Sequence, residues 1–373
     1  RALLVNNLRY ADAIAQDQRY ARRHPPSTEE FLAMAQLLWH HRRPEQALAL
    51  LLQWRQRPAL PQPYWAKVAE LAWYLDEIDV AQRAYGELLG YNATLSEQAI
   101  DRAIQLAATT EAPERGLAAA LHGWERHGQP VHLVLALDFA MTLERWALAD
   151  ELLRQGLASG AALTQRSDFL LLAARLASHR EQPAQALDYL RQAYQGAPAN
   201  SAVAQALLWF LIDGAPAYSE PLQHYLRDIG RRAAAKPSLW SVLGAGWHAL
   251  ERYTPALHWY QRDLPNQQRS WRWLAGFADA LQQAGHYKDA DRVKQRVLVL
   301  LQQRFDGAAE PETEERQLRL RLLAELKGEQ LAWRNYLAQP GQESPPPRDA
   351  WLKLLLEWAI RDGSAPLAEQ LED

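Results

Sequence analysis

Residue types that could perform catalysis are present, but their spacing matches no catalytic motif. Three of the eleven histidines, His122, His127 and His132, are five residues apart. That spacing crosses an expected helix end at Gly128–Pro130 and places no two imidazoles on one helix face, so it predicts no metal site. The segment Gly244–Gly246 lacks the third glycine of a dinucleotide-binding turn and follows no strand pattern. We therefore expect no catalytic residue, no cofactor, no metal and a chain that is not an enzyme.

Tryptophan is the other residue type with binding chemistry, because its large ring forms energetic centres of protein interfaces. The chain has 15 tryptophans, enough to suggest a carbohydrate-binding surface as well. Four of them, Trp65, Trp146, Trp240 and Trp247, fall at positions that a repeating helical pattern assigns to the core. For these four we expect a packing role.

The totals exclude several classes of protein. The 373 residues are 48% hydrophobic, which is enough for a large core. The 41 basic and 44 acidic residues are interspersed and give a net charge of −3, so there is no polycation for nucleic acid. No apolar run reaches the roughly 20 residues of a membrane span. The absence of cysteine excludes disulfides and thiolate metal sites.

The most regular stretch, Ser238–Tyr260, indicates how the rest of the chain is built. Trp240, Leu243 and Trp247 lie at i, i+3 and i+7, so they share one face of a helix. A glycine follows the leucine, an alanine comes twelve residues after the glycine, and an aromatic residue follows four residues later. This spacing predicts two antiparallel helices that approach closely at small residues. One such hairpin cannot bury its apolar face alone, so hairpins must stack.

A small residue near the start of each second helix recurs through most of the chain. From the first instance its intervals are 34, 34, 35, 33 and 37 residues, and the last two instances are 34 apart. The sixth unit is degenerate, and its equivalent position falls near Pro221. A proline is compatible with a helix only in its first turn. The small residues are Ala13, Ala47, Ala81, Gly116, Ala149, Ala186, Ala256 and Ala290.

We expect residues 1–373 to form one all-α, right-handed solenoid, with regular repeats over 1–305 and irregular repeats over 306–373. A ninth hairpin is expected over Glu312–Ala338 with its small residue at Ala332, and a tenth unit from Trp351. The chain begins at Arg1 and ends in what resembles the start of a helix. We interpret it as a fragment truncated at both ends.

The repeat resembles that of tetratricopeptide arrays, and the resemblance implies that the positions of each first helix outside the core line a groove. These are the second, fifth, ninth and twelfth to thirteenth positions. They correspond to Trp39, His40, Glu70, Trp73, Tyr74, Asp101, Gln105, Asp138, Met141, Arg175, His179, Gln205, Trp209, His248, Arg272 and Asp279. The carboxylates favour a cationic or polar ligand, and the aromatic rings favour burial against a partner. We expect a partner-binding groove made by Trp39, Glu70, Trp73, Tyr74, Asp101, Asp138, Arg175, Trp209 and Asp279.

The repeats resemble the tetratricopeptide (TPR) family over nearly the whole chain, most specifically in Ser238–Tyr260 and Trp271–Ala290. The divergent, arginine- and alanine-rich repeats in Tyr10–Pro25, Pro44–Leu52 and Val80–Leu89 resemble the periplasmic scaffold region of Pel-type (PelB-like) exopolysaccharide export proteins of the outer membrane. No diagnostic motif separates this group from exporters of cellulose or poly-N-acetylglucosamine.

The resemblance implies a scaffold in the periplasm, tethered through regions outside the fragment. It would recruit a periplasmic polysaccharide-modifying enzyme and guide the polymer to an outer-membrane pore, with the polysaccharide as a second ligand. A general TPR adaptor for assembly of cytosolic or secretion complexes is the alternative. Neither reading involves nucleic acid or a membrane span in this fragment.

Overall fold

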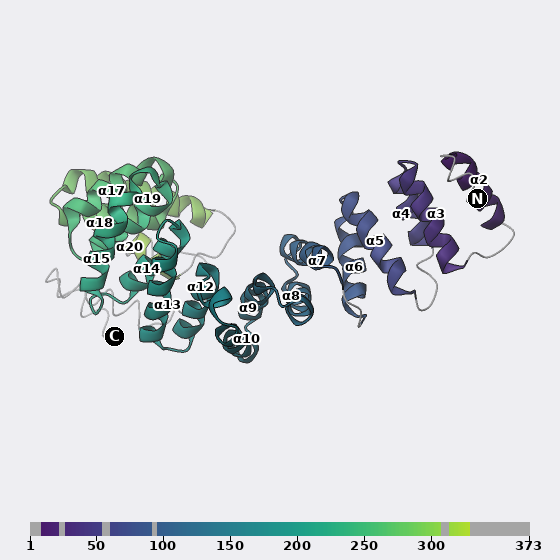
Figure 1. Ribbon diagram of the computed structural model, residues 1–373. Helices are drawn as coiled ribbons and strands as arrows, with labels where there is room; N and C mark the ends of the chain where they lie inside the picture. Colours follow the sequence, from purple (N-terminus) through teal and green to yellow (C-terminus); the bar gives the residue numbers. More distant parts are fainter. Residues whose placement is uncertain (1–8, 22–26, 54–59, 92–94, 307–312, 329–373) are drawn as a thin grey trace, which may run out of the picture. The chain divides into compact units, whose positions relative to one another are not determined.

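The computed structural model describes residues 9–21, 27–53, 60–91, 95–306 and 313–328 of the chain (Figure 1). These ranges contain helices and no strand, so the fold is an all-α solenoid of helix-turn-helix repeats. None of the helices within them is both long enough and apolar enough to cross a membrane. The chain divides into two compact units, residues 1–198 and 199–373. The expectation of one continuous superhelix stays a prediction.

Unit 1 consists of stacked hairpins, and each second helix packs against the first helix of the next hairpin. The first-helix series is α3, α5, α7, α9 and α12, and the second-helix series is α2, α4, α6, α8, α10 and α13 (Figure 1). The bounds are α2 Tyr10–Ala21, α3 Thr28–His40, α4 Pro44–Gln53, α5 Gln62–Tyr74, α6 Ile78–Leu89, α7 Glu97–Thr109, α8 Pro113–His127, α9 Pro130–Thr142, α10 Trp146–Ala158, α11 Ala161–Thr164, α12 Ser167–His179 and α13 Pro183–Gly196.

Unit 2 is built in the same way from the pairs α14–α15, α16–α17 and α18–α19, and α20 packs against α19. Pro221 is the third residue of α15, which confirms that this proline lies in the first turn. Ala332 and Trp351, from the expected ninth and tenth units, lie outside the described residues. The bounds are α14 Ser201–Asp213, α15 Ser219–Arg232, η2 Ala233–Ala235, η3 Pro237–Leu239, α16 Trp240–Ala249, α17 Tyr253–Gln267, α18 Trp271–Gln283, α19 Tyr287–Asp306 and α20 Thr313–Lys327.

The small residues that define the repeat are buried, as predicted, and the seven alanines among them are 0–1% exposed. Gly116, the one glycine of the series, has Phe139 so close that an added Cβ would lie 2.4 Å from the ring. In the most regular repeat, Tyr260 packs against Trp273 and Phe277 of the next hairpin at centroid distances of 5.3 and 5.8 Å. Burial raises the pKa of the Tyr260 phenol. The aromatic residue therefore joins neighbouring repeats.

The four tryptophans expected to have a packing role are not fully buried, although Trp247 packs against the buried core. Trp65, Trp146, Trp240 and Trp247 are only half-buried. At the first of these positions the fully buried ring is the neighbouring Tyr64, whose hydroxyl donates to the Leu51 carbonyl at 2.7 Å. A tyrosine fits there because its polar end has a buried acceptor. The connection between α10 and α12 contains the one-turn helix α11.

The turns inside seven of the described hairpins share one backbone geometry, and the α14–α15 turn does not have it. A residue five positions before the small residue adopts the left-handed conformation, with φ between 50° and 59° in six hairpins, and φ is 84° at Gly285. The next residue donates its N–H to the carbonyl five residues earlier, in the first helix, as Arg145 does to Ala140 at 2.8 Å. This is the Schellman helix ending, which usually uses glycine. Here six charged residues occupy it: Arg42, Asp76, Glu111, Glu144, Glu181 and Glu251.

Candidate functional site

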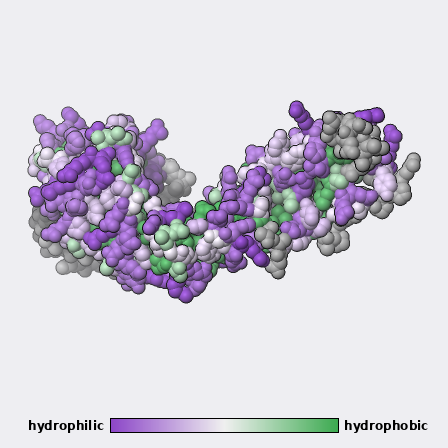
Figure 2. All heavy atoms as spheres, in the orientation of Figure 1, coloured by the Kyte–Doolittle hydropathy of each residue, from purple (hydrophilic) through white to green (hydrophobic). Residues whose placement is uncertain are grey.

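All nine residues predicted to bind a partner lie on first helices and are at least partly accessible. Tyr74 and Trp209 are the most exposed of the aromatic members, at 66% and 43%. Met141, also expected on this face, is instead 1% exposed. The reason is that α9 is apolar around most of its circumference and is enclosed by its neighbours. We call the outward side of the first helices the first-helix face. Figure 2 shows that hydrophilic residues predominate on the visible surface.

Four side chains of α3 and α5 form an aromatic cluster on the first-helix face of unit 1: Trp39, Lys67, Glu70 and Tyr74. The rings of Trp39 and Tyr74 lie 5.4 Å apart and are inclined by 41°. The Lys67 ammonium lies over the Trp39 ring at 5.2 Å and donates to Glu70 at 2.6 Å. The cluster is therefore an accessible aromatic pair with one cation and one anion beside it.

The neighbouring tryptophan on α5 is also covered by a cation. The guanidinium of Arg102, from α7, lies 5.5 Å from the centre of the Trp73 ring. Burial raises the pKa of the nearby Tyr85 phenol because it disfavours the phenolate, and the positive charge of Arg102 opposes this shift. Trp73 thus joins two repeats and is less available to a partner than Tyr74.

Three of the four predicted acidic residues, Asp101, Asp138 and Asp279, have basic partners on neighbouring first helices. His132 Nε2 donates to Asp101 at 3.1 Å, and His248 Nε2 donates to Asp279 at 2.9 Å. Arg175 lies 3.9 Å from Asp138. Each of these three carboxylates therefore faces a basic side chain of the chain itself. They link adjacent repeats, which reduces their attraction for an incoming cation.

His132 makes an inter-repeat contact that the sequence analysis did not predict. It is fully buried near the start of α9, against Gly123, where an added Cβ would lie 2.6 Å from Nδ1. That Nδ1 has no hydrogen-bond partner among the described residues. A detectable signal exists, because His132 follows Asp101 by 31 residues and Asp279 follows His248 by 31 residues. In both cases the spacing places the two residues on successive first helices.

In unit 2 the first-helix face contains a cleft of about 380 Å³ between α16, α18 and α20. Ala275 and Gly276 line this cleft. Arg272 and Glu314, which also line it, form an ion pair at 3.0 Å. The hydrogen bond from His248 lowers the pKa of Asp279, and Arg321 and Lys294 add to the effect. The cleft residues are His248, Trp271, Arg272, Ala275, Gly276, Asp279, Glu314, Gln317, Leu318 and Arg321.

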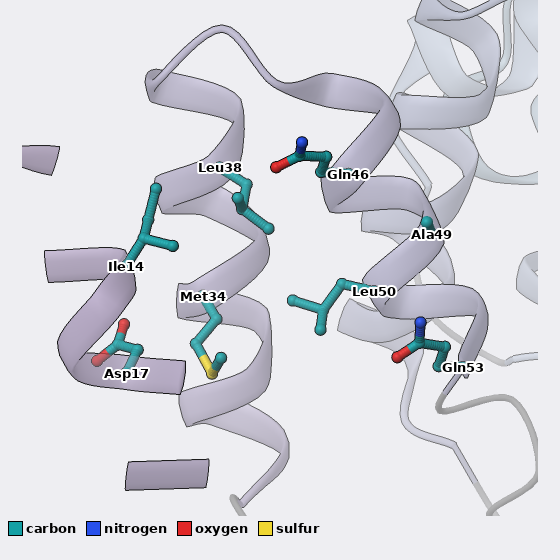
Figure 3. Close-up of a pocket in the computed structure, with 8 residues that line it drawn as sticks. All are labelled: Ile14, Asp17, Met34, Leu38, Gln46, Ala49, Leu50 and Gln53. Atoms are coloured by element: carbon teal, nitrogen blue, oxygen red, sulfur yellow. The ribbon is translucent and has the colours of Figure 1, made fainter. Parts of the chain in front are cut away.

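A second hollow, of about 330 Å³, lies between α2, α3 and α4 (Figure 3). Met34 of α3 and Leu50 of α4 line it from opposite sides, and Gln46 and Gln53 lie on α4 with Leu50. None of the nine predicted residues lines it. Among the residues that the structure describes, no group of three or more histidine and acidic side chains could hold a metal ion.

A stack of two-helix repeats with accessible rings and charges on successive first helices defines a helical-repeat scaffold. The sequence model described as "Tetratricopeptide repeat" matches residues 18–303. The chain belongs to the tetratricopeptide repeat family.

Similarity to individual proteins is low. PilF of Pseudomonas aeruginosa is 11% identical over 65% of this chain and 96% of its own, with a TM-score of 0.43. The C-terminal part of a TPR repeat-containing protein from Cytophaga hutchinsonii is 12% identical over 65% and 96%, with a TM-score of 0.49. Human IFIT1, solved as a dimer with m7Gppp-AAAA, is 14% identical over 93% and 86%, with a TM-score of 0.45. No curated protein matches the sequence.

Proposed function

We propose that this chain is a non-catalytic protein-interaction scaffold that binds a protein partner through its first-helix face. The observation that carries the proposal is the aromatic cluster, where Tyr74 is 66% exposed beside the half-buried ring of Trp39. Accessible aromatic side chains on a rigid helical face are the usual energetic centres of protein interfaces. Stacked repeats supply the extended surface that such an interface requires.

We further propose a bacterial cell-envelope role in Pel-like exopolysaccharide export. The scaffold would recruit a periplasmic polymer-modifying enzyme and guide the polymer toward an outer-membrane pore. The support is the resemblance of the divergent repeats in Pro44–Leu52 and Val80–Leu89, together with the cysteine-free composition. A general adaptor for assembly of other complexes is the remaining reading.

The test is a pull-down from bacterial envelope extract with this chain as bait. The informative variant is Tyr74→Ala, because a side chain so exposed adds little to folding. A matched control is Tyr287→Ala, which removes a 65% exposed tyrosine from a second helix. The proposal expects capture of a carbohydrate-active enzyme that decreases with Tyr74→Ala and not with Tyr287→Ala.

The other outcomes separate the two parts of the proposal. Capture of the same enzyme by both variants would contradict the first-helix face as its site. Capture of cytosolic factors alone would contradict the export role and leave a general adaptor. Charge reversal at Asp101 or Asp138 is a poor test, because it would also break the contacts with His132 and Arg175.

A further inference from the structure

The strongest unexplained feature of the first-helix face is an aromatic ring without a cation. Four tryptophans of this chain each have a cation of the chain itself over the ring, at 4.9–5.5 Å. The pairs are Trp39 with Lys67, Trp73 with Arg102, Trp240 with Arg262 and Trp271 with Arg272. Tyr74 is more exposed than any of these rings, and within the described ranges no cation lies over it.

A carboxylate lies on the same side of α5 as the open ring. Glu70 precedes Tyr74 by four residues, which places the two side chains one above the other on the helix. Glu70 is 48% exposed and uses Oε2 to accept from Lys67 at 2.6 Å. Its other oxygen has no hydrogen-bond partner in the described part of the chain. The pair with Lys67 joins neighbours on one helix surface, and such exposed pairs are weak.

The exposed ring of Tyr74 and the second carboxylate oxygen of Glu70 together suit one kind of ligand group, a guanidinium. A guanidinium stacks its flat face on an aromatic ring and donates N–H groups in its own plane to a carboxylate beside that ring. An ammonium group has no planar face and makes the two contacts less well together. The Trp39 ring lies beside the Tyr74 ring, with 5.4 Å between the two ring centroids. Lys67 opposes an incoming cation, because it is held beside the same carboxylate.

We propose that Tyr74, Glu70 and Trp39 form a binding site for an arginine side chain of the protein partner. The inference rests on the proposed scaffold function and names the chemistry that its partner presents to unit 1. A sugar ring would also stack on Tyr74, but it would not depend on the charge of Glu70. That difference decides between the two ligands.

The experiment uses Nα-acetyl-arginine amide as the probe and follows ring-labelled tyrosine by NMR. Tyr74 is assigned by the signal that Tyr74→Leu removes. We expect a saturable shift of the Tyr74 signal, with affinity about two- to fivefold weaker for the uncharged isostere Nα-acetyl-citrulline amide. Glu70→Gln is expected to weaken arginine binding and leave citrulline binding unchanged. Lys67→Gln is expected to strengthen arginine binding, because it removes the opposing charge.

The inference is overturned by the absence of a saturable shift, by equal affinity for arginine and citrulline, or by insensitivity to Glu70→Gln. Tyr287→Leu is the folding control, and its Tyr74 signal should respond to arginine as in the unchanged chain. A failure of arginine binding can be distinguished from a failure of the proposed scaffold function. If the pull-down still depends on Tyr74 while arginine does not bind, the first-helix face holds a partner through other chemistry. Binding of cellotriose with no arginine response would assign the site to sugar instead.

Discussion

Charged residues in a left-handed conformation are the most regular feature at the scale of single residues. A side chain with a Cβ is strained there, and glycine is not. The six hairpin turns tolerate this because each is fixed by backbone hydrogen bonds, such as Glu144 N–H to Met141 at 3.1 Å and Arg145 N–H to Ala140 at 2.8 Å. The exposed carboxylate of Glu144 makes no hydrogen bond among the described residues.

Replacing one of these residues with glycine should therefore stabilise the protein. For Glu144→Gly, where φ is 55°, we expect the free energy of unfolding to increase by about 0.5–1 kcal/mol, since strain relief exceeds the added freedom of the unfolded chain. The measurement is urea unfolding followed by circular dichroism. Glu144→Ala is the matched control, because it removes the carboxylate and keeps the Cβ. If alanine stabilises as much as glycine, the strain is not the cause.

Glycines on the second helices give a second test at this scale. Gly116 faces the ring of Phe139, so a Cβ at 2.4 Å forces the ring to move. Gly116→Ala should therefore lower the free energy of unfolding by about 1–3 kcal/mol. Gly86 is also inside a second helix but has nothing within 4 Å of its Cβ position. Gly86→Ala should instead increase stability by roughly 0.5–1 kcal/mol through helix propensity. Thermal melts of both variants would show opposite shifts, and shifts of the same sign would contradict the packing argument.

At the scale of elements, polar pairs connect successive first helices. The bond from His248 on α16 to Asp279 on α18 is the clearest case, because it lowers the pKa of the carboxyl below its ordinary value of 3.8. A carboxyl whose pKa is lower in the folded state stabilises that state above its unfolded pKa. The contribution is lost as the pH falls through the folded value.

The Asp279→Asn variant should therefore be less stable than the unchanged chain at neutral pH. The difference between the two melting temperatures should shrink as the pH is lowered below about 4. A series of thermal melts from pH 7 to pH 3 measures it. In a His248→Phe background the donor is gone, so the same asparagine substitution should show a smaller pH-dependent difference. An equal difference in both backgrounds would assign the effect to Arg321 and Lys294.

The helices were predictable from the sequence because the pattern that specifies them is local. Small residues such as Ala47 and Ala81 recur at a nearly fixed interval, and α3 begins with a local capping box of Ser27 and Glu30. The partner of a side chain in a neighbouring repeat depends on the rotamers of both residues. The two residues also lie on helices about one repeat apart in the sequence, so a local pattern does not reveal their contact. The first-helix face was therefore located from the sequence, but the bonds of His132 and His248 that modify its charge were not.

At the scale of the whole molecule, the contacts divide the chain between residues 198 and 199 into two compact units. Each unit contains complete hairpins, and repeats draw their stability from themselves and their nearest neighbours. We expect residues 1–198 and 199–373, expressed separately, each to fold. Both should show helical circular dichroism and a cooperative melt. A fragment that is unfolded alone and folds when the other is added would show that the units depend on each other.

The charged hairpin turns also affect how such a sequence can change during evolution. Because backbone hydrogen bonds define the turn, its outward side chain is not needed for the core, and Arg42 and Glu181 hold the same geometry with opposite charges. Each of these six turns therefore offers one surface position where the sign of the charge can be exchanged by substitution without refolding. Lineages of this family that move between acidic and basic surroundings could adjust the charge along this edge repeat by repeat and keep every hairpin intact.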